Sequence, residues 1–261
     1  MQLDIFQVDA FSCEAFGGNP AAVCPLDVWL PDTTLQQIAA ENNLSETAYV
    51  VRNGEVFELR WFTPTVEVDL CGHATLAAAW VLFELLGEKR DMLRFSTRSG
   101  ELQVRREDGR LAMNFPAKQP ELVSVPPGLL QALGLERVDA LYRTDDYVVV
   151  VADEAIVAGL NPDFAALAAF DVRGVAVTAP SRQFDFVSRW FGPRVGVNED
   201  PVTGSAHTSL APYWAQRLGK RSLSAEQGGA RKGQLHCEVM DGGRVIISGQ
   251  GALYLRGTIY I

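Results

Sequence analysis

The sequence predicts an α+β protein made of two similar halves, each built on one apolar central helix. A glycine opens an apolar helical stretch at Gly72 and again at Gly204, and a second glycine, Gly87 or Gly219, closes each stretch fifteen residues later. A closing glycine is typical of a left-handed helix C-cap. The remaining strand-like segments do not alternate regularly with helices, so we expect mostly antiparallel or mixed sheets rather than a doubly wound fold.

The repeat extends beyond the two helices. Arg60–Pro64 reads Arg-Trp-Phe-Thr-Pro before the first helix, and Arg189–Pro193 reads Arg-Trp-Phe-Gly-Pro before the second. A hairpin-type Asp-Gly follows in each copy, at Asp108 and at Asp241. Three landmarks in the same order indicate an internal duplication.

In the first half, loose alternation from Leu3 to Asp9 predicts a strand, and a turn-rich segment leads to a second, short strand at Ala21–Cys24. Asp32 is expected to cap a helix that ends near Asn42. Glu46 then lies where this helix gives way to a strand. The further predicted strands cover 47–51, 56–62 and, separated by turns at 99–100 and 108–109, the segment 93–115.

A domain boundary is predicted where four prolines, Pro116, Pro120, Pro126 and Pro127, interrupt both helix and sheet. The first domain then covers 1–117 and the second 118–251. The helices predicted in the second half are one at 129–133 and one capped by Asn161-Pro162. The predicted strands lie at 147–152, 174–179, 184–191, 234–240, 244–248 and within 252–261.

Composition and charge limit the classes of partner. A hydrophobic content of 48% suffices for two buried cores, and the net charge of −9, without any run of Lys and Arg, argues against a nucleic-acid or anionic-membrane surface. The N-terminus lacks the pattern of a signal peptide, and the longest apolar run, Leu76–Phe83, is too short to span a membrane. Four scattered cysteines indicate free thiols in a reducing cytoplasm.

The openings of the two central helices are the best candidates for chemistry. A helix N-terminus offers unpaired N–H donors and attracts a carboxylate or phosphate. We expect two such ends to face one cleft, with Gly72-His73 and Gly204-Ser205 on opposite sides and Asp200 beside the second. The alternative is a pair of well-capped core helices with no site; the duplication, together with the polar residues at both openings, favours a site.

Other kinds of site receive less support. His207 and His236 have no partners at metal-ligand spacing, so no metal site is expected. Ser205 and His207 stand in Thr-Gly-Ser-Ala-His, which lacks the second glycine of a nucleophile elbow. Neither a G-x-G-x-x-G nor a P-loop is present. Chemistry without a cofactor is the enzyme class that remains.

Four ordered motifs resemble the PhzF family, the phenazine biosynthesis-like proteins of the diaminopimelate epimerase-like fold. The motifs are G-N-P-A-A-V at 18–23, N-L-S-E-T at 43–47, R-W-F-T-P-x-x-E-V-x-L-C-G-H-A-T at 60–75 and E-D-P-V-T-G-S-A-H at 199–207. The resemblance covers essentially the whole chain and is strongest to members with no assigned substrate. It implies a sheet around a central helix in each domain, return of 252–261 to the first domain, and a homodimer.

The resemblance also implies roles for particular residues. Glu46 corresponds to the family's acid/base, and His73, Asp200, Gly72, Gly204 and Ser205 are expected to line the substrate site together with Asn19 and Ser45 of the matching motifs. Amino-acid epimerases of this fold use one cysteine from each domain. Cys71 precedes Gly72, but no cysteine lies near Asp200–Gly204, so this pair is incomplete.

These residues lead to the hypothesis of a cofactor-free isomerase acting on a small carboxylate. Glu46 takes a proton from an activated carbon and returns it on the same face. His73 and Asp200 orient an amino or hydroxyl group. Desolvation of Glu46 would raise its pKa and helix dipoles would lower it, and the sequence does not decide between them. Two alternatives are an epimerase using Cys71 and a non-catalytic binding protein.

Overall fold

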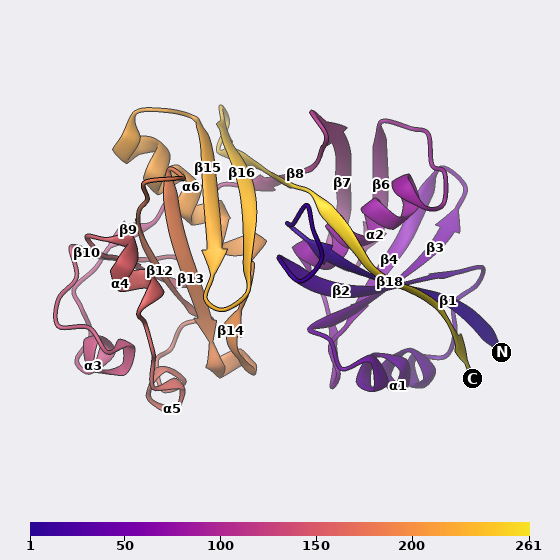
Figure 1. The fold of residues 1–261 in the computed structure, drawn as a ribbon, viewed down its shortest axis with the longest axis horizontal. Coiled ribbons are helices and arrows are strands. Elements are labelled where there is room, and N and C mark those ends of the chain that lie inside the picture. Colours follow the sequence, from indigo (N-terminus) through magenta and orange to yellow (C-terminus); the bar gives the residue numbers. More distant parts are fainter. The chain divides into compact units, whose positions relative to one another are not determined.

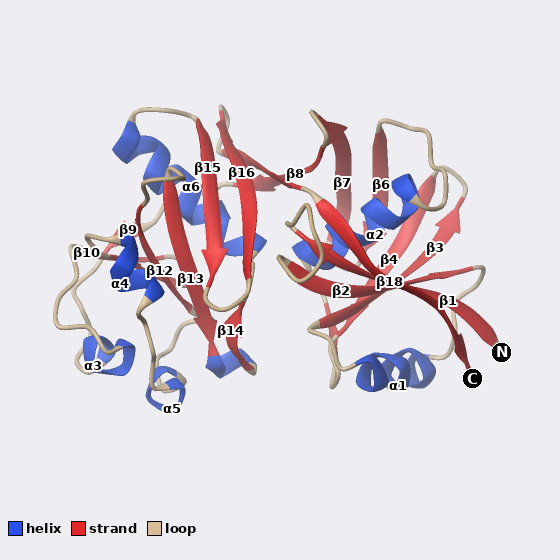
Figure 2. Cartoon of the chain, viewed as in Figure 1, coloured by secondary structure: helices blue, strands red, loops and turns tan.

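The computed structural model describes residues 1–261, which form two compact units. Unit 1 consists of Met1–Asn114 and Ser248–Ile261, and unit 2 of Phe115–Ile247. Strands greatly outnumber helices in both units (Figure 2). The predicted α+β class is therefore confirmed.

Unit 1 is built mainly of strands, with α2 as its buried helix and α1 on its outside (Figure 1). Its elements are β1 (Gln2–Ala10), β2 (Asn19–Leu26), α1 (Asp32–Asn42), β3 (Glu46–Asn53), β4 (Val56–Phe62), β5 (Glu67–Val68), α2 (Gly72–Glu84), β6 (Met92–Thr97), β7 (Gly100–Glu107), β8 (Arg110–Pro116) and β18 (Gly251–Tyr260).

Unit 2 has α6 as its long helix and several short helices. Its elements are β9 (Glu121–Leu122), α3 (Leu129–Leu133), β10 (Ala140–Arg143), β11 (Tyr147–Val150), α4 (Glu154–Ala158), α5 (Phe164–Leu167), β12 (Val175–Pro180), β13 (Phe186–Gly192), the 3₁₀ helix η1 (Pro193–Val195), β14 (Val197–Asp200), α6 (Gly204–Leu218), β15 (Ser222–Gly228), β16 (Lys232–Met240) and β17 (Arg244–Gly249).

Strand pairing repeats between the units. In unit 1, β2 pairs parallel with β3, β3 antiparallel with β4, β4 parallel with β6, and β6 antiparallel with β7. In unit 2 the corresponding series runs from β11 through β12, β13 and β15 to β16 with the same order of directions. The C-terminal β18 lies antiparallel beside β1. This shared topology confirms the internal duplication that the sequence predicted.

An equivalent arginine–glutamate ion pair occurs in both copies of the repeat. Arg60 of β4 donates from Nε and Nη2 to the two carboxylate oxygens of Glu67, at 2.7 Å each. Arg189 of β13 binds Glu199 in the same bidentate way, also at 2.7 Å. Each guanidinium carbon lies 5.1 Å from the ring centre of the phenylalanine two residues later. The repeated Arg-Trp-Phe therefore marks a structural clamp rather than a substrate contact.

Both central helices are buried and begin at the predicted glycine. Nearly every side chain of α2 is excluded from solvent, and α2 packs against β1, β2 and β3. Helix α6 packs on β15 and β16 and ends on Gly219, whose φ of 66° is left-handed. Helix α2 ends at Glu84, three residues before Gly87, so only the second predicted closing glycine caps its helix directly.

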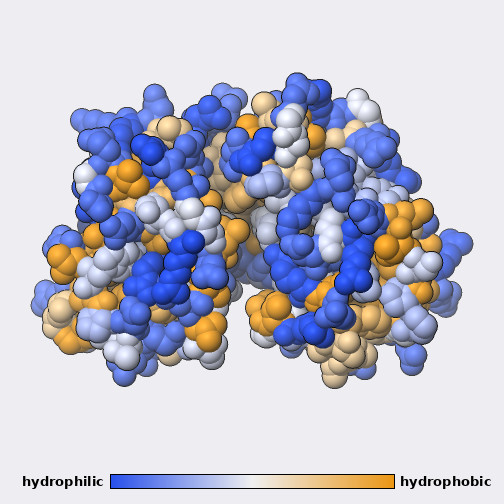
Figure 3. All heavy atoms as spheres, turned by 180° about the vertical axis from the view of Figure 1, so that it is seen from behind, coloured by the Kyte–Doolittle hydropathy of each residue, from blue (hydrophilic) through white to orange (hydrophobic).

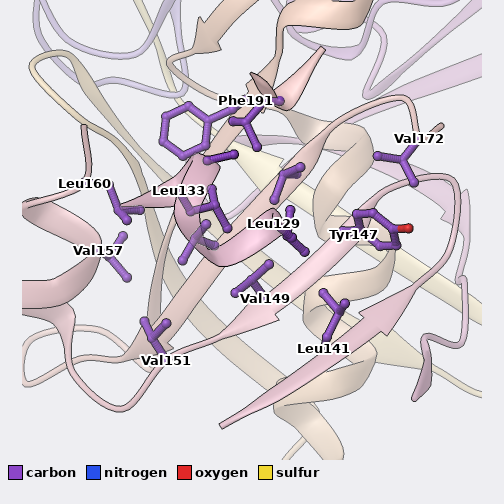
Figure 4. Packing of buried hydrophobic residues seen from close by; sticks show 14 of the residues in the cluster. Leu129, Leu133, Leu141, Tyr147, Val149, Val151, Val157, Leu160, Val172 and Phe191 are labelled. Atoms are coloured by element: carbon purple, nitrogen blue, oxygen red, sulfur yellow. The ribbon is translucent and has the colours of Figure 1, made fainter. Parts of the chain in front are cut away.

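Separate apolar clusters stabilise the units. The cluster under α1 in unit 1 includes Leu35, Ile38, Tyr49 and Phe62. Figure 4 shows the cluster of unit 2, in which Leu129 and Leu133 of α3 meet the β-branched side chain of Val149 from β11. Alternate residues of a strand share one face, so a single strand can supply several members of such a core.

Several predicted details differ from the structure. Asp32 does not cap α1; Pro31 occupies that position, and the Asp32 carboxylate accepts a bond from Arg60 instead. Asn161-Pro162 does not cap the helix predicted there; this helix begins at Phe164, and the Asp163 carboxylate caps it by accepting from the backbone nitrogen of Ala166. The structure adds elements that the sequence analysis did not identify, namely β5, β9, β10, α4, η1, β14 and β15.

On the face shown in Figure 3, polar residues predominate in both units and hydrophobic residues form separate patches. None of the helices combines the length and the apolar character needed to cross a bilayer.

Candidate active site

Glu46 is the first residue of β3 and follows the end of α1. Asn43, at the C-cap of α1, adopts a left-handed φ of 49°, which turns the chain out of the helix. Glu46 then pairs in register with Ala21 of the neighbouring β2. Its side chain retains 18% of its accessible surface, so the carboxylate is largely removed from solvent without being sealed.

His73 approaches Glu46 from the first turn of α2. Cys71 is the N-cap residue of this helix, and Gly72 is its first residue. A Cβ added to Gly72 would meet no atom within 4 Å, so this glycine leaves open space at the helix entrance. Burial leaves His73 only 6% exposed.

Three side chains of unit 1 converge on the imidazole of His73. Its Nε2 lies 3.1 Å from Oε2 of Glu46, and its Nδ1 lies 3.5 Å from Sγ of Cys71. The amide nitrogen of Asn19, the first residue of β2, lies 3.2 Å from the same Nδ1. The ring is therefore held on both nitrogens, which fixes its orientation.

Burial and charge act against each other in this cluster. Burial raises the pKa of the Glu46 carboxyl, but the charge and contacts of His73 outweigh burial, and the pKa is lowered from its ordinary value. For His73, burial lowers the pKa, but the neighbouring Cys71 and Glu46 raise it well above its ordinary value. Burial, reinforced by the charge of Glu46, raises the pKa of Cys71. The directions of these shifts favour the charged forms of Glu46 and His73 and the neutral form of Cys71.

The entrance of α6 in unit 2 carries a different network. Asp200 ends β14, and its Oδ2 accepts a hydrogen bond of 2.6 Å from the Thr203 hydroxyl. Gln227 donates to the backbone oxygen of Asp200 at 2.9 Å and accepts from the backbone nitrogen of Thr203 at 3.0 Å. Gly204 opens the helix, and Ser205 follows in its first turn. The carboxylate of Asp200 is thereby fixed at the helix opening.

Comparison with known proteins identifies the family of this chain. The family model described as "Phenazine biosynthesis-like protein" matches residues 8–257. The chain belongs to this family. It is 67% identical to an uncharacterized isomerase of Pseudomonas aeruginosa over the whole of both chains. It is also similar to a crystal structure of a PhzF-family phenazine biosynthesis protein from Enterococcus faecalis, with 47% identity, full coverage of both chains and a TM-score of 0.97.

A more distant likeness extends the fold beyond the phenazine biosynthesis-like family. A hydroxyproline epimerase from Agrobacterium vitis is 11% identical, with a TM-score of 0.58, over 99% of this chain and 92% of the epimerase chain. At this identity the likeness concerns the fold alone. It supports the epimerase-like fold class that the motifs implied, in which a sheet surrounds a central helix in each of two related domains.

The structure groups most of the predicted site residues by unit. In unit 1 it brings together Glu46, His73 and Asn19 beside Gly72. In unit 2 it places Asp200, Gly204 and Ser205 at one helix opening. The remaining predicted residue, Ser45, lies exposed next to Glu46. The roles of these residues in binding and catalysis remain predictions.

Arg173 is a polar residue of the α6 entrance that the sequence analysis missed. It donates 2.7 Å from Nη1 to the hydroxyl of Ser205, while its Nε and Nη2 bind the buried carboxylate of Asp146. The indole of Trp190 donates to the same carboxylate at 3.1 Å. Arg173 stands in no motif, so the only available signal was a single arginine immediately before the predicted strand at 174–179.

The other two histidines occupy structural positions. His207 is fully buried in α6, contacts the backbone oxygen of Thr203 at 3.0 Å, and burial lowers its pKa to about 4. His236 contacts the Ser222 hydroxyl at 3.2 Å. A possible metal-ligand group instead forms from Glu46, Cys71 and His73, whose ligand atoms lie within 4.8 Å of one another. The sequence analysis overlooked it because Glu46 is distant from the other two in the chain.

Proposed function

We propose that this protein is an isomerase of the phenazine biosynthesis-like family that moves a proton on a small carboxylate substrate without a cofactor. The observation that carries the proposal is the buried Glu46–His73 pair, with 3.1 Å between Oε2 and Nε2, at the open entrance of α2. A partly buried carboxylate next to a charged partner is the arrangement by which proteins prepare a general base.

Glu46 performs both proton transfers in this mechanism. As a carboxylate it takes a proton from a substrate carbon that is acidified by a neighbouring carboxyl group or π-system, and the bonding electrons move into that system. As a carboxylic acid it then returns the proton to another carbon on the same face. The lowered pKa of Glu46 keeps it ionised at neutral pH and makes its protonated form a ready donor.

Exclusion of water from the site by the substrate changes the pKa of Glu46. A bound substrate removes solvent from Glu46, and desolvation raises the pKa of a carboxyl group. The proton affinity of Glu46 therefore increases when the substrate carbon is in place. The charge of His73 limits this increase, since it favours the carboxylate.

The helix entrances supply substrate binding. The free N–H groups at Gly72 and Gly204 hold the substrate carboxylate, since helix N-termini favour anions. His73 and Asp200 orient an amino or hydroxyl group, and Asn19, Ser45 and Ser205 complete the binding set. That both entrances serve one substrate follows from the family resemblance and is part of this proposal.

Cys71 has less support as an alternative base. Burial raises the pKa of its thiol, so little thiolate is present at neutral pH. Cys237, the cysteine of unit 2, is fully buried in β16, and burial raises its pKa to about 12. The two-thiol mechanism therefore has no second member.

Hydrogen exchange into the substrate tests the proposal. The protein and its Glu46→Gln variant are incubated in D₂O with cyclic and α-amino carboxylic acids, including the dihydro-hydroxyanthranilate type, and followed by proton NMR. We expect deuterium to enter a carbon position with the unmodified protein and with Glu41→Gln, an exposed control on α1. Exchange that persists in Glu46→Gln would contradict the role of Glu46, and exchange lost only in Cys71→Ser would support the cysteine alternative.

Assembly and location are further parts of the proposal. The family resemblance implies a homodimer, and the scattered free thiols favour the cytoplasm. Light scattering after size exclusion measures the assembly directly: a mass of about 57 kDa, twice the 28.5 kDa of the chain, is expected for a homodimer.

A further inference from the structure

Strand register shows which residues of the two units hold equivalent positions. In unit 1, Thr47 of β3 lies opposite Phe62 of β4. In unit 2, Val175 of β12 lies opposite Phe191 of β13. The two phenylalanines end the repeated Arg-Trp-Phe, so Thr47 and Val175 are equivalent residues of the duplicated topology, and the residues that precede them are equivalent as well.

The pair formed by Glu46 and His73 in unit 1 therefore has Gly174 and Ser205 in its place in unit 2. Glu46 and Gly174 precede the two matched strand residues, and His73 and Ser205 are each the second residue of a central helix. A Cβ added to Gly174 would lie 2.3 Å from Cζ2 of Trp190, so the indole occupies the space that a side chain would need. No acid can face Ser205 from this position.

Arg173, the residue before Gly174, makes the contact with the helix instead. Its Nη1 donates to Oγ of Ser205 at 2.7 Å. Its Nε donates to Oδ1 of Asp146 at 2.9 Å, its Nη2 donates to Oδ2, and Asp146 is only 2% exposed. The guanidinium carbon also lies 5.3 Å from the ring centre of Trp190. These contacts fix the guanidinium in one orientation, with Nη1 directed at the α6 entrance.

The contact with Arg173 determines how Ser205 can bind a ligand. A guanidinium has donors only, so the Ser205 oxygen accepts, and its hydroxyl hydrogen is left to donate elsewhere. No other group of the chain accepts this hydrogen, and Ser205 is half-buried at the opening of α6. The N–H groups of the first helical turn are donors without an intrahelical acceptor. A carboxylate, which has acceptors only, is the group that suits this set.

We propose that Arg173 is a positioning residue that holds the Ser205 hydroxyl as a hydrogen-bond donor to the substrate carboxylate at the α6 entrance. The buried Asp146 neutralises the guanidinium, so Arg173 acts by orienting the hydroxyl rather than by attracting an anion. The identity of the ligand as a substrate rests on the proposed function, whereas the preference of Ser205 for a carboxylate does not.

Isothermal titration with benzoate, a carboxylate on a π-system, tests this inference. Asp146→Asn/Arg173→Met removes both charges and leaves the net charge unchanged. We expect it to bind benzoate about 2–10-fold more weakly, as for the loss of one hydrogen bond. The matched control is Asp171→Asn/Arg194→Met, which removes an exposed ion pair of the same unit and is expected to bind benzoate like the unmodified protein. An equal loss in the control contradicts the role of Arg173.

A double-mutant cycle shows whether Arg173 acts through Ser205. Ser205→Ala is expected to weaken benzoate binding by a similar factor, and adding Asp146→Asn/Arg173→Met to it is expected to cause no further loss. Additive losses would mean that Arg173 acts independently of the hydroxyl. Unchanged affinity in Asp146→Asn/Arg173→Met, or no saturable binding of benzoate by the unmodified protein, would also overturn the proposal.

Arg173→Lys provides a second variant that keeps a positive charge beside Asp146. An ammonium lacks the planar fork that reaches Asp146 and Ser205 together, so benzoate affinity is expected to fall as in the charge-free variant. Full affinity in Arg173→Lys contradicts the positioning role. Thermal melting verifies that each variant is folded.

Deuterium exchange keeps this inference separate from the proposed function. Benzoate is not turned over, so its binding reports on Arg173 and Ser205 and not on proton transfer by Glu46. Exchange that fails while the benzoate cycle holds concerns the isomerase alone. On a substrate identified by exchange, Arg173→Lys is expected to raise KM about 2–10-fold with little change in kcat, and a fall in kcat at constant KM contradicts a role in positioning the carboxylate.

Discussion

The entrances of α2 and α6 occupy equivalent places in two copies of one topology, yet they hold different chemistry. At α2, an acid, an imidazole and a thiol contact one another, and every pKa among them is displaced. At α6, Asp200, Thr203 and Gln227 form a network of well-directed hydrogen bonds. One entrance therefore contains groups that can exchange a proton, and the other contains groups that hold a fixed arrangement.

The clamps that support the two entrances show how such divergence is possible. Arg60–Glu67 and Arg189–Glu199 have the same bidentate geometry and the same contact with a phenylalanine ring. These pairs lie in the strands that precede the central helices and tie each strand to the short one beside it. Because the clamp positions the helix opening, the residues at that opening can change without loss of the fold.

The largest expected effect separates the two entrances by activity. Glu46→Gln removes the proton acceptor at α2, and we expect the rate of deuterium exchange to fall by about 10²–10⁴-fold, the usual contribution of a general base. Asp200→Asn at α6 keeps the hydrogen bond to Thr203 and is expected to reduce the rate less. Exchange rates from NMR decide the order, and an equal loss in both variants would remove the distinction between the entrances.

The repeat itself could be predicted because it depends on local backbone chemistry. Asp108 and Gly109 both have positive φ, at 49° and 74°, as a two-residue hairpin turn between β7 and β8 requires. In the second copy the positive angles fall on Gly242 and Gly243, one residue later than the repeated Asp-Gly. Glycine and aspartate at such turns are recognisable in a sequence without any knowledge of tertiary contacts.

The contacts of the candidate site could not be read in this way. The motifs identified Glu46 and His73 separately, but the contact between them depends on how α2 packs against β3. The same packing turns Cys71 toward Nδ1 of His73, which spacing in the chain does not reveal. Arg173 joins the α6 entrance only because the buried Asp146 directs its guanidinium. The direction of the Glu46 pKa shift likewise required the position of the imidazole.

The two clamps are expected to differ in their contribution to stability. Arg189 is 8% exposed and also donates to the backbone oxygens of Val157 and Leu160. Its replacement leaves the Glu199 carboxylate and the Leu160 carbonyl without this donor, so Arg189→Met is expected to lower the free energy of unfolding by about 3 kcal/mol, as for a broken buried ion pair. Arg60→Met is expected to cost less, because the additional partner of Arg60 is the exposed Asp32. Urea unfolding measures both, and a larger loss for Arg60→Met would contradict the difference between the clamps.

The shifted pKa values of Glu46 and His73 make stability depend on pH at the α2 entrance. Because its pKa is lowered in the folded state, Glu46 stabilises the fold at pH values above its ordinary pKa of 4.5. This stabilisation is lost as the pH falls through the pKa of the folded state. Because its pKa is raised in the folded state, His73 stabilises the fold at pH values below its ordinary pKa of 6.5. This stabilisation is lost as the pH rises through the pKa of the folded state. The stability difference between the unmodified protein and His73→Gln is thus expected to be largest between pH 4.5 and 6.5.

Carbon NMR of the Glu46 carboxyl tests the cause of this pH dependence. Without the imidazolium, burial is unopposed, and the pKa of Glu46 is expected to rise in His73→Gln. His236→Gln in β16 is a matched control that is expected to leave the Glu46 titration unchanged. A Glu46 pKa that does not rise in His73→Gln would show that burial has less influence than the structure indicates.

The smallest expected effect concerns binding at α6. Ser205→Ala removes the hydroxyl that accepts from Arg173 and is expected to raise KM by about 2–10-fold with little change in kcat, since one hydrogen bond contributes about 0.5–1.5 kcal/mol. Ser209→Ala is the matched control, because its hydroxyl bonds only within the same helix, to the Ala206 carbonyl. Steady-state kinetics on the substrate identified by exchange separate the two parameters. A fall in kcat at constant KM would place proton transfer at α6 as well, and the two entrances would then share the chemistry rather than divide it.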